Sequence, residues 1–379
     1  MKRWGCVCAL LLLAAAAWGA ARKLTVQQLK DLLASEKQAN MTDGQTAEVL
    51  ENVELTERLS RSTMDSMARD VPGQMTTEQL FVLEARSATL PPPAADIPAD
   101  PAPDAATQNA ILAKAMDYIT KTYAQLPPLT ATKETRRFQD SSQISQEAFA
   151  SKNSASFAPK ATPIHYTAAD ENTVMFHGGA EQASAPTQKT TWGQNGMIVL
   201  LGQAPNLNTV LQEAQGSEKI GWARWENVDG KKMAVFSFAV DKKKSRYGVN
   251  YCCFPDVGQA GPMQMRGTAS GGEGGNYQSV DQWKPWKAVV PYRGEIFVDP
   301  DTGVVTRLAV QGEFKGSDPV RLENQRIDFG EVKVGDKTFT VPVRTLIDTL
   351  EQPYPDLPSG RFIFRHTLFT SDYKDYKAG

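Results

Sequence analysis

The side chains best suited to chemistry are few and far apart in this sequence of 379 residues. Its three histidines, His165, His177 and His366, lack the paired spacing of a zinc site. The sequence contains no glycine-rich phosphate loop and no G-x-S-x-G nucleophile motif. We therefore interpret the histidines as structural, and we predict a protein without a metal, without a cofactor and without enzymatic activity.

Aromatic residues form the clearest concentration of one residue type. Every tryptophan beyond the first eighteen residues lies between Trp192 and Trp286. Large aromatic side chains fill sheet cores and also line apolar ligand pockets, so both interpretations stay open. Trp222 and Trp225 are an odd number of positions apart, so in a regular strand they face opposite sides. The candidate ligand-binding residues are Trp222, Phe236, Phe238, Trp283 and Trp286.

Two adjacent cysteines, Cys252 and Cys253, are the only ones beyond residue 8. Consecutive strand residues point to opposite faces, which favours two free thiols, one buried and one near the surface. A disulfide between them is the alternative in an oxidising compartment, although its small ring suits a strand poorly.

Antiparallel strands must position these residues. Asp229-Gly230 lies between two alternating runs, and this pair accepts the positive φ of a two-residue type I′ turn. After the turn, Phe236 and Phe238 share one face of the strand and Ser237 takes the other. A third run, residues 246–254, follows at hairpin spacing. The alternation predicts an antiparallel sheet with one apolar face.

A second hairpin is predicted between residues 292–298 and 304–310. Asp299–Gly303 joins them, with proline and glycine where a tight turn needs them. Its aspartates lack the ligand spacing of a calcium loop, so we interpret the segment as a turn. Further strands are predicted from residue 327 to 368, where Pro342 indicates an edge strand or a bulge.

Composition divides the chain into segments. Residues 1–21 place Lys2 and Arg3 before an apolar run and small residues, which is typical of a cleavable signal peptide. A transmembrane anchor is the alternative, but the run is shorter than the ~20 residues that a span needs. Residues 22–90 carry leucine stripes and capping boxes at Thr25 and Thr76, which predict a small helical segment.

Residues 91–103 form a proline-rich linker, and residues 104–371 form the sheet domain. A helix from Asp104 to Tyr123 is expected to cover the sheet, because its apolar residues recur four apart. Within the domain, the glycine-rich insertion at 255–282 is expected to be a mobile surface loop.

The net charge and the predicted cellular location restrict the possible partners. The formal net charge is -2 and no basic stripe exists, so we predict no nucleic-acid partner. Once the signal peptide is removed, no stable membrane anchor is expected, and we place the protein outside the cytoplasm, in the periplasm.

The helix from Asp104, the strands after it and the stretch from Tyr292 to Arg307 resemble the lipoprotein-carrier half-barrel family. The whole chain, including residues 328–335, also resembles a group of uncharacterised secreted bacterial proteins. The resemblance implies an α+β fold: a curved antiparallel β-sheet, or half-barrel, with covering helices, preceded by the small all-α segment. In that family an apolar cavity under the helices binds acyl chains or a segment of a partner.

Three functions are therefore considered. The leading hypothesis is a non-enzymatic envelope protein that binds an apolar or lipid-like small molecule, or an envelope protein partner, on the half-barrel. The alternatives are a hydrolase-like enzyme with dispersed carboxylates, and a structural interaction module that uses the leucine-rich helices. A dry apolar cavity favours the carrier, whereas a buried, hydrogen-bonded carboxylate pair in a polar cleft favours the enzyme.

Overall fold

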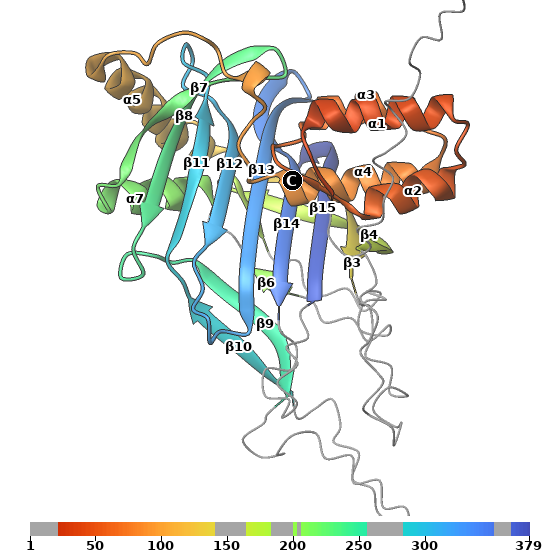
Figure 1. Ribbon diagram of the computed structural model, residues 1–379. Helices are drawn as coiled ribbons and strands as arrows, with labels where there is room; N and C mark the ends of the chain where they lie inside the picture. Colours follow the sequence, from red (N-terminus) through yellow and green to blue (C-terminus); the bar gives the residue numbers. More distant parts are fainter. Residues whose placement is uncertain (1–21, 141–163, 183–199, 203–205, 256–282, 352–364) are drawn as a thin grey trace, which may run out of the picture.

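The computed structural model describes residues 22–140, 164–182, 200–202, 206–255, 283–351 and 365–379 (Figure 1). The fold is α+β, as the sequence predicts. A curved antiparallel sheet of 10 strands runs in the order β5-β4-β3-β15-β14-β13-β12-β11-β8-β7, and it does not close into a barrel. The predicted signal peptide and the glycine-rich insertion from residue 256 lie outside the described residues.

The large sheet contains β3 (Leu129–Gln139), β4 (His165–His177), β5 (Ala180–Gln182), β7 (Ile220–Val228), β8 (Lys231–Val240), β11 (Tyr292–Val298), β12 (Val305–Gly312), β13 (Val320–Val334), β14 (Lys337–Glu351) and β15 (Arg365–Ala378). The described helices are α1 (Val26–Gln38), α2 (Asp43–Glu51), α3 (Arg61–Ala68), α4 (Gln74–Ser87), α5 (Ala105–Lys121) and α7 (Leu207–Gly216). Two short 3₁₀ turns are η1 (Ala94–Asp96) and η2 (Tyr123–Gln125).

Both predicted hairpins are confirmed. Asp229 and Gly230 have φ values of 50° and 80° between β7 and β8, the positive values that a type I′ turn requires. The Asp299–Gly303 segment joins β11 to β12. Gly303 has φ +77°, and a Cβ there would lie 2.6 Å from the backbone of Lys114 on α5. Glycine is therefore needed both for the turn and for the close approach of the helix.

The third run does not continue the sheet beside β8, contrary to the prediction. β8 pairs with β11, whereas β9 (Gly248–Pro255) pairs with β6 (Leu200–Gly202) and β10 (Trp283–Val289) in a separate three-stranded sheet. The connection at residues 241–247 is too long for a tight hairpin, so nothing local holds β9 against β8. This pairing was decided by distant strands.

One face of the large sheet, here called the inner face, carries the main apolar core. Helix α5 buries Ile111, Ala115 and Ile119 against it, as the four-residue spacing predicts, and Asp104 caps the helix by accepting from Thr107 N. Helix α7 adds a second stripe. Among the sheet residues in this core are Ala234, Phe236, Phe238, Val240, Ile296, Leu308 and Val310.

The N-terminal helices have a core of their own, and β1 (Arg22–Leu24) pairs in parallel with β2 (Val53–Leu55) beside them. The capping box at Thr25 is confirmed. The one predicted at Thr76 is wrong, because α4 already begins at Gln74 and the Thr76 hydroxyl donates to Asp43 Oδ1 (2.7 Å). A distant aspartate thus replaces the local cap.

Helix α4 packs on the opposite, outer face of the sheet, so the helical segment is attached to the domain (Figure 1). Val82 and Ala85 pack in one apolar cluster with sheet residues Phe138, Leu346 and Leu368. Beside them the Glu84 carboxylate, 0% exposed, accepts from Arg326 Nη2 at 2.8 Å and from Arg344 Nη2 at 2.7 Å. A second buried ion pair, Arg58–Glu226 (2.6 Å), ties the segment to β7.

Three strand details differ from or refine the sequence predictions. Strand β4 is unbroken over 13 residues. Pro342 lies at a register shift in β14, a central strand, which confirms the bulge rather than the edge. Strand β15 continues past residue 371 to Ala378 and pairs with β3, so the sheet domain is longer than predicted.

Within the described ranges, no helix is both long and apolar enough to span a bilayer.

The first prediction tests the inner-face core. Phe236 is 1% exposed and Ser237 is exposed on the other face. We expect Phe236→Ala to cost about 3 to 5 kcal/mol of unfolding free energy and Ser237→Ala less than about 1 kcal/mol. Denaturant melts of the two variants measure this. Equal losses would contradict the assignment of faces.

The second prediction tests the attachment of the helical segment. Glu84→Ala leaves Arg326 and Arg344 buried without their shared carboxylate, which should cost about 3 to 5 kcal/mol. Glu78→Ala on the same helix is the control, because Glu78 only accepts a surface hydrogen bond from Gln74 (2.9 Å). It should cost less than about 1 kcal/mol. Similar melting curves for the two variants would show that the buried carboxylate does not hold the segment in place.

Candidate functional site on the inner face of the sheet

Four of the five aromatic residues proposed from the sequence pack in or against the apolar core of the inner face. Phe236 and Phe238 are 1% and 3% exposed in the core that α5 and α7 also enter. Trp222 and Trp286 are partly buried against the same core. The side chains of Trp283, Cys252 and Cys253 lie outside the described residues, although their backbones belong to β10 and β9. The phenylalanines therefore fill a packed core.

Trp222 and Trp225 contact each other, which corrects the expectation for a regular strand. A register shift between Trp222 and Arg224 turns the chain, and the two rings lie 4.7 Å apart, centroid to centroid. The bulge adds one residue to the count, so positions an odd number apart reach the same face.

A groove of about 690 Å³ opens beside Trp225, between α5 and the turns that follow β7 and β11. Lys232 lies over the Trp225 ring (4.4 Å) and pairs with Asp100 of the proline-rich linker (3.1 Å). Trp225 Nε1 donates to Pro101 O (3.0 Å). The groove has lysines and aspartates in its wall, so it is not a dry apolar cavity.

The other half of the inner face is polar. Strands β3, β15, β14 and β13 lie side by side there, and their register aligns polar residues in rows. One row consists of Gln139, Thr367, Thr349 and Glu323. The inner polar cluster, as we name it, comprises Arg137, Gln139, Glu323, Gln325, Thr349, Glu351, Arg365 and Thr367.

Every member of the inner polar cluster is at most 9% exposed. Arg365 forms an ion pair with Glu351, and Gln325 Nε2 donates to Glu323 Oε1 (3.1 Å). Thr349 Oγ1 donates to Thr367 O (3.2 Å). Among the described residues, however, Glu351 Oε2 and Thr367 Oγ1 have no hydrogen-bond partner. Buried polar atoms are nearly always paired, so two unpaired atoms on neighbouring strands are an unusual feature of this cluster.

Glu323 is the titratable group of most interest in this cluster. Burial raises its pKa to about 7, although hydrogen bonds from Gln325 and Tyr247 lower it in part. Burial and the nearby charge of Arg365 lower the pKa of Arg137 to about 10, so Arg137 remains a cation at neutral pH. The site thus combines a carboxyl that titrates near neutrality with a buried permanent cation.

Sequence reasoning missed this cluster for a physical reason. Pairs such as Arg137 and Gln139, or Thr349 and Glu351, flank a single apolar residue and therefore indicate a strand with a solvated polar face. In the fold this face is buried. The one available signal was that pairs of polar residues two positions apart recur on several strands.

His165 and His177 lie at opposite ends of β4, and His366 lies on β15. His366 contacts Asp348 through Nε2, and its backbone N–H donates to Asp140 Oδ1 (2.6 Å). Among the residues that the structure describes, no three His, Cys, Asp or Glu side chains form a group able to hold a metal ion.

Comparison with protein-family models, with curated proteins and with solved structures found no match. The resemblance to half-barrel carriers therefore stays a prediction.

The third prediction concerns pH. The unfolded Glu323 ionises near the ordinary value of 4.5, whereas the folded state keeps its proton up to about pH 7. The contribution of Glu323 to stability is therefore complete below about pH 4.5 and is lost as pH rises to about 7, a change of about 3 kcal/mol. In Glu323→Gln, unfolding free energies from denaturant melts at pH 5 and pH 8 should differ less than in the wild type.

Glu331→Gln, an exposed position on the same strand, is the control and should keep the wild-type pH dependence. The assignment would be wrong if Glu323→Gln kept it as well.

Proposed function

We propose that this chain is a secreted, non-enzymatic binding protein whose ligand contacts the inner polar cluster. The observation that supports this is the burial of eight polar side chains, each at most 9% exposed, on one face of four adjacent strands. A purely structural core gains little from such groups, because a buried ion pair such as Arg365–Glu351 rarely stabilises more than apolar packing does. Ligand recognition accounts for their presence.

The proposed ligand is a small polar molecule with several hydrogen-bonding groups. Glu351 Oε2 is an acceptor and the Thr367 hydroxyl can donate or accept. Arg137 adds a cation, and its guanidinium lies 5.5 Å from the Phe369 ring centroid, which provides an apolar contact. The apolar or lipid-like ligand expected from the sequence has less support, because α5 and α7 pack into the same core as Phe236 and Phe238.

A second candidate function is catalysis by a hydrolase-like enzyme. The observation in its favour is Glu323, whose raised pKa of about 7 suits a general acid or base at neutral pH. The two functions differ in what is recovered from the protein, because a binding protein releases its ligand unchanged whereas an enzyme releases products.

The fourth prediction tests the site with a matched pair of variants. Thr367 and Thr370 lie on the same strand, both are at most 2% exposed, and neither hydroxyl has a partner among the described residues. Thr367 belongs to the inner polar cluster and Thr370 to the outer face. Replacing either by valine removes a buried unpaired hydroxyl, so neither variant should lose stability.

We expect native mass spectrometry of the protein purified from its own host to show a bound small molecule. The bound fraction should fall about tenfold in Thr367→Val, because one lost hydrogen bond is worth about 1.4 kcal/mol, and it should be unchanged in Thr370→Val. A wild-type protein without any bound molecule, or equal occupancy in the two variants, would count against the proposal. Recovery of cleaved molecules would favour the enzyme.

A further inference from the structure

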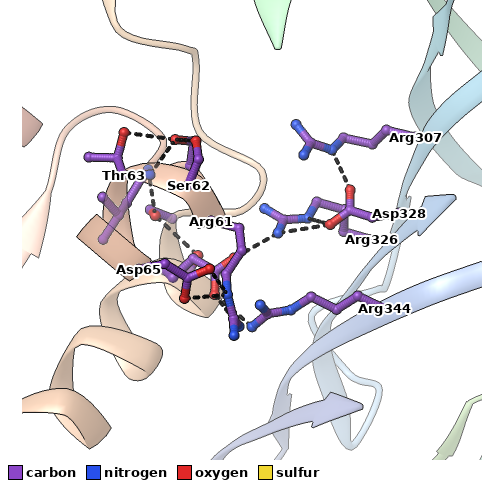
Figure 2. Close-up of polar contacts among 12 residues, drawn as sticks. Arg61, Ser62, Thr63, Asp65, Arg307, Arg326, Asp328 and Arg344 are labelled. Atoms are coloured by element: carbon purple, nitrogen blue, oxygen red, sulfur yellow. Dashed lines mark hydrogen bonds and ion pairs between the residues drawn. The ribbon is translucent and has the colours of Figure 1, made fainter. Parts of the chain in front are cut away.

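Arg61, Arg326 and Arg344 all lie within 4 Å of the Glu84 carboxylate, where the helical segment meets the outer face of the sheet. Figure 2 shows these three arginines. Arg326 and Arg344, from β13 and β14, each donate to one carboxylate oxygen, at 2.8 and 2.7 Å. Arg61, the first residue of α3, places Nη1 3.9 Å from Glu84 Oε2, which is too far for a hydrogen bond. The guanidinium carbons of Arg61 and Arg344 lie 4.9 and 6.0 Å from the centroid of the Phe81 ring.

These arginines have more donors than the described residues satisfy. Arg61 Nη1, Arg326 Nη1, Arg344 Nη1 and Arg344 Nε are buried atoms without a hydrogen-bond acceptor in the described part of the chain. Asp372 Oδ1 lies 3.9 Å from Arg344 Nε, too far for a hydrogen bond, and Asp372 Oδ2 accepts from Arg136 (3.1 Å). Arg61 Nε already donates to Asp65 (2.9 Å), and Asp328 already accepts from Arg307 and Arg326.

The charges of the arginines outweigh the effect of burial at the neighbouring Asp328. Burial alone would raise the pKa of Asp328, but the charges and hydrogen bonds of Arg307 and Arg326 outweigh it and hold that pKa below its ordinary value. The first turn of α3 adds the partial positive charge of a helix N-terminus beside Arg61. Four unpaired donors on cationic groups match an acceptor with several oxygens and negative charge better than they match a water molecule.

We propose that Arg61, Arg326 and Arg344 form a binding site for a phosphate-type oxyanion. The side chains of Arg326 and Arg344 are 1% and 5% exposed, whereas that of Arg61 is 29% exposed, so the anion reaches the site past Arg61. Guanidinium groups bind phosphate oxygens in pairs, which explains why arginine rather than lysine stands at all three positions. The anion completes the attachment of α3 and α4 to the sheet.

The test measures binding by isothermal titration calorimetry, with inorganic phosphate and with glycerol 3-phosphate at constant ionic strength. We expect Arg61→Gln to weaken phosphate binding tenfold or more, because it removes one charge-assisted donor and leaves the two arginines on Glu84 in place. Arg293→Gln, an exposed arginine on β11, is the matched control and should bind as the wild type does. Binding of both compounds indicates a phosphate group on a larger molecule, and binding of inorganic phosphate alone indicates the free ion.

The Glu84→Gln variant should change the affinity for phosphate in the opposite direction. It removes the negative charge that competes with the anion, so phosphate should bind more tightly and should raise the melting temperature of this variant more than that of the wild type. If Glu84→Gln does not fold, the comparison of Arg61→Gln with Arg293→Gln decides alone. The proposal is overturned if neither compound binds the wild type, or if Arg61→Gln and Arg293→Gln bind equally.

Discussion

The arrangement of the chain depends on one buried carboxylate, Glu84, held between Arg326 and Arg344. These partners are more than two hundred residues away in sequence, on adjacent strands of the sheet. Because no charge can stay buried without a partner, the helix and the two strands must meet in one relative position. The apolar contacts of Val82 and Ala85 bury surface beside this carboxylate. The ion network fixes the position of the helix relative to the two strands.

The two faces of the sheet follow different physical rules. The outer face joins the helical segment through ion pairs and a small apolar cluster, whereas the inner face is divided along its width. Its β7–β12 half packs α5 and α7 in an apolar core. Its β13–β3 half buries hydrogen-bonding groups instead. A single strand such as β13 thus joins the helical segment on one face and buries hydrogen-bonding groups on the other, since successive side chains alternate between faces.

Much of the fold was predictable because its signals are local. The Asp229-Gly230 turn, the Thr25 capping box and the apolar stripe of α5 each depend on residues within a few positions of one another. The site was not predictable in the same way. Phe236 and Phe238 had the right alternation for a ligand cavity, but whether helices cover such a face is set by distant segments. The inner polar cluster looked like a solvated face for the same reason.

The sequence by itself determined the α+β class, the hairpin turns, the helix that begins after Asp104 and the absence of zinc-type and phosphate-loop motifs. Only the tertiary structure decided that β8 pairs with β11, that the Trp222 and Trp225 rings meet across a bulge, and that Glu323 and Glu351 are buried. The physical reason is the distance along the chain between the residues that interact. Turns and caps are held by hydrogen bonds between near neighbours, whereas strand partners, burial and pKa depend on groups that the chain brings together from far apart.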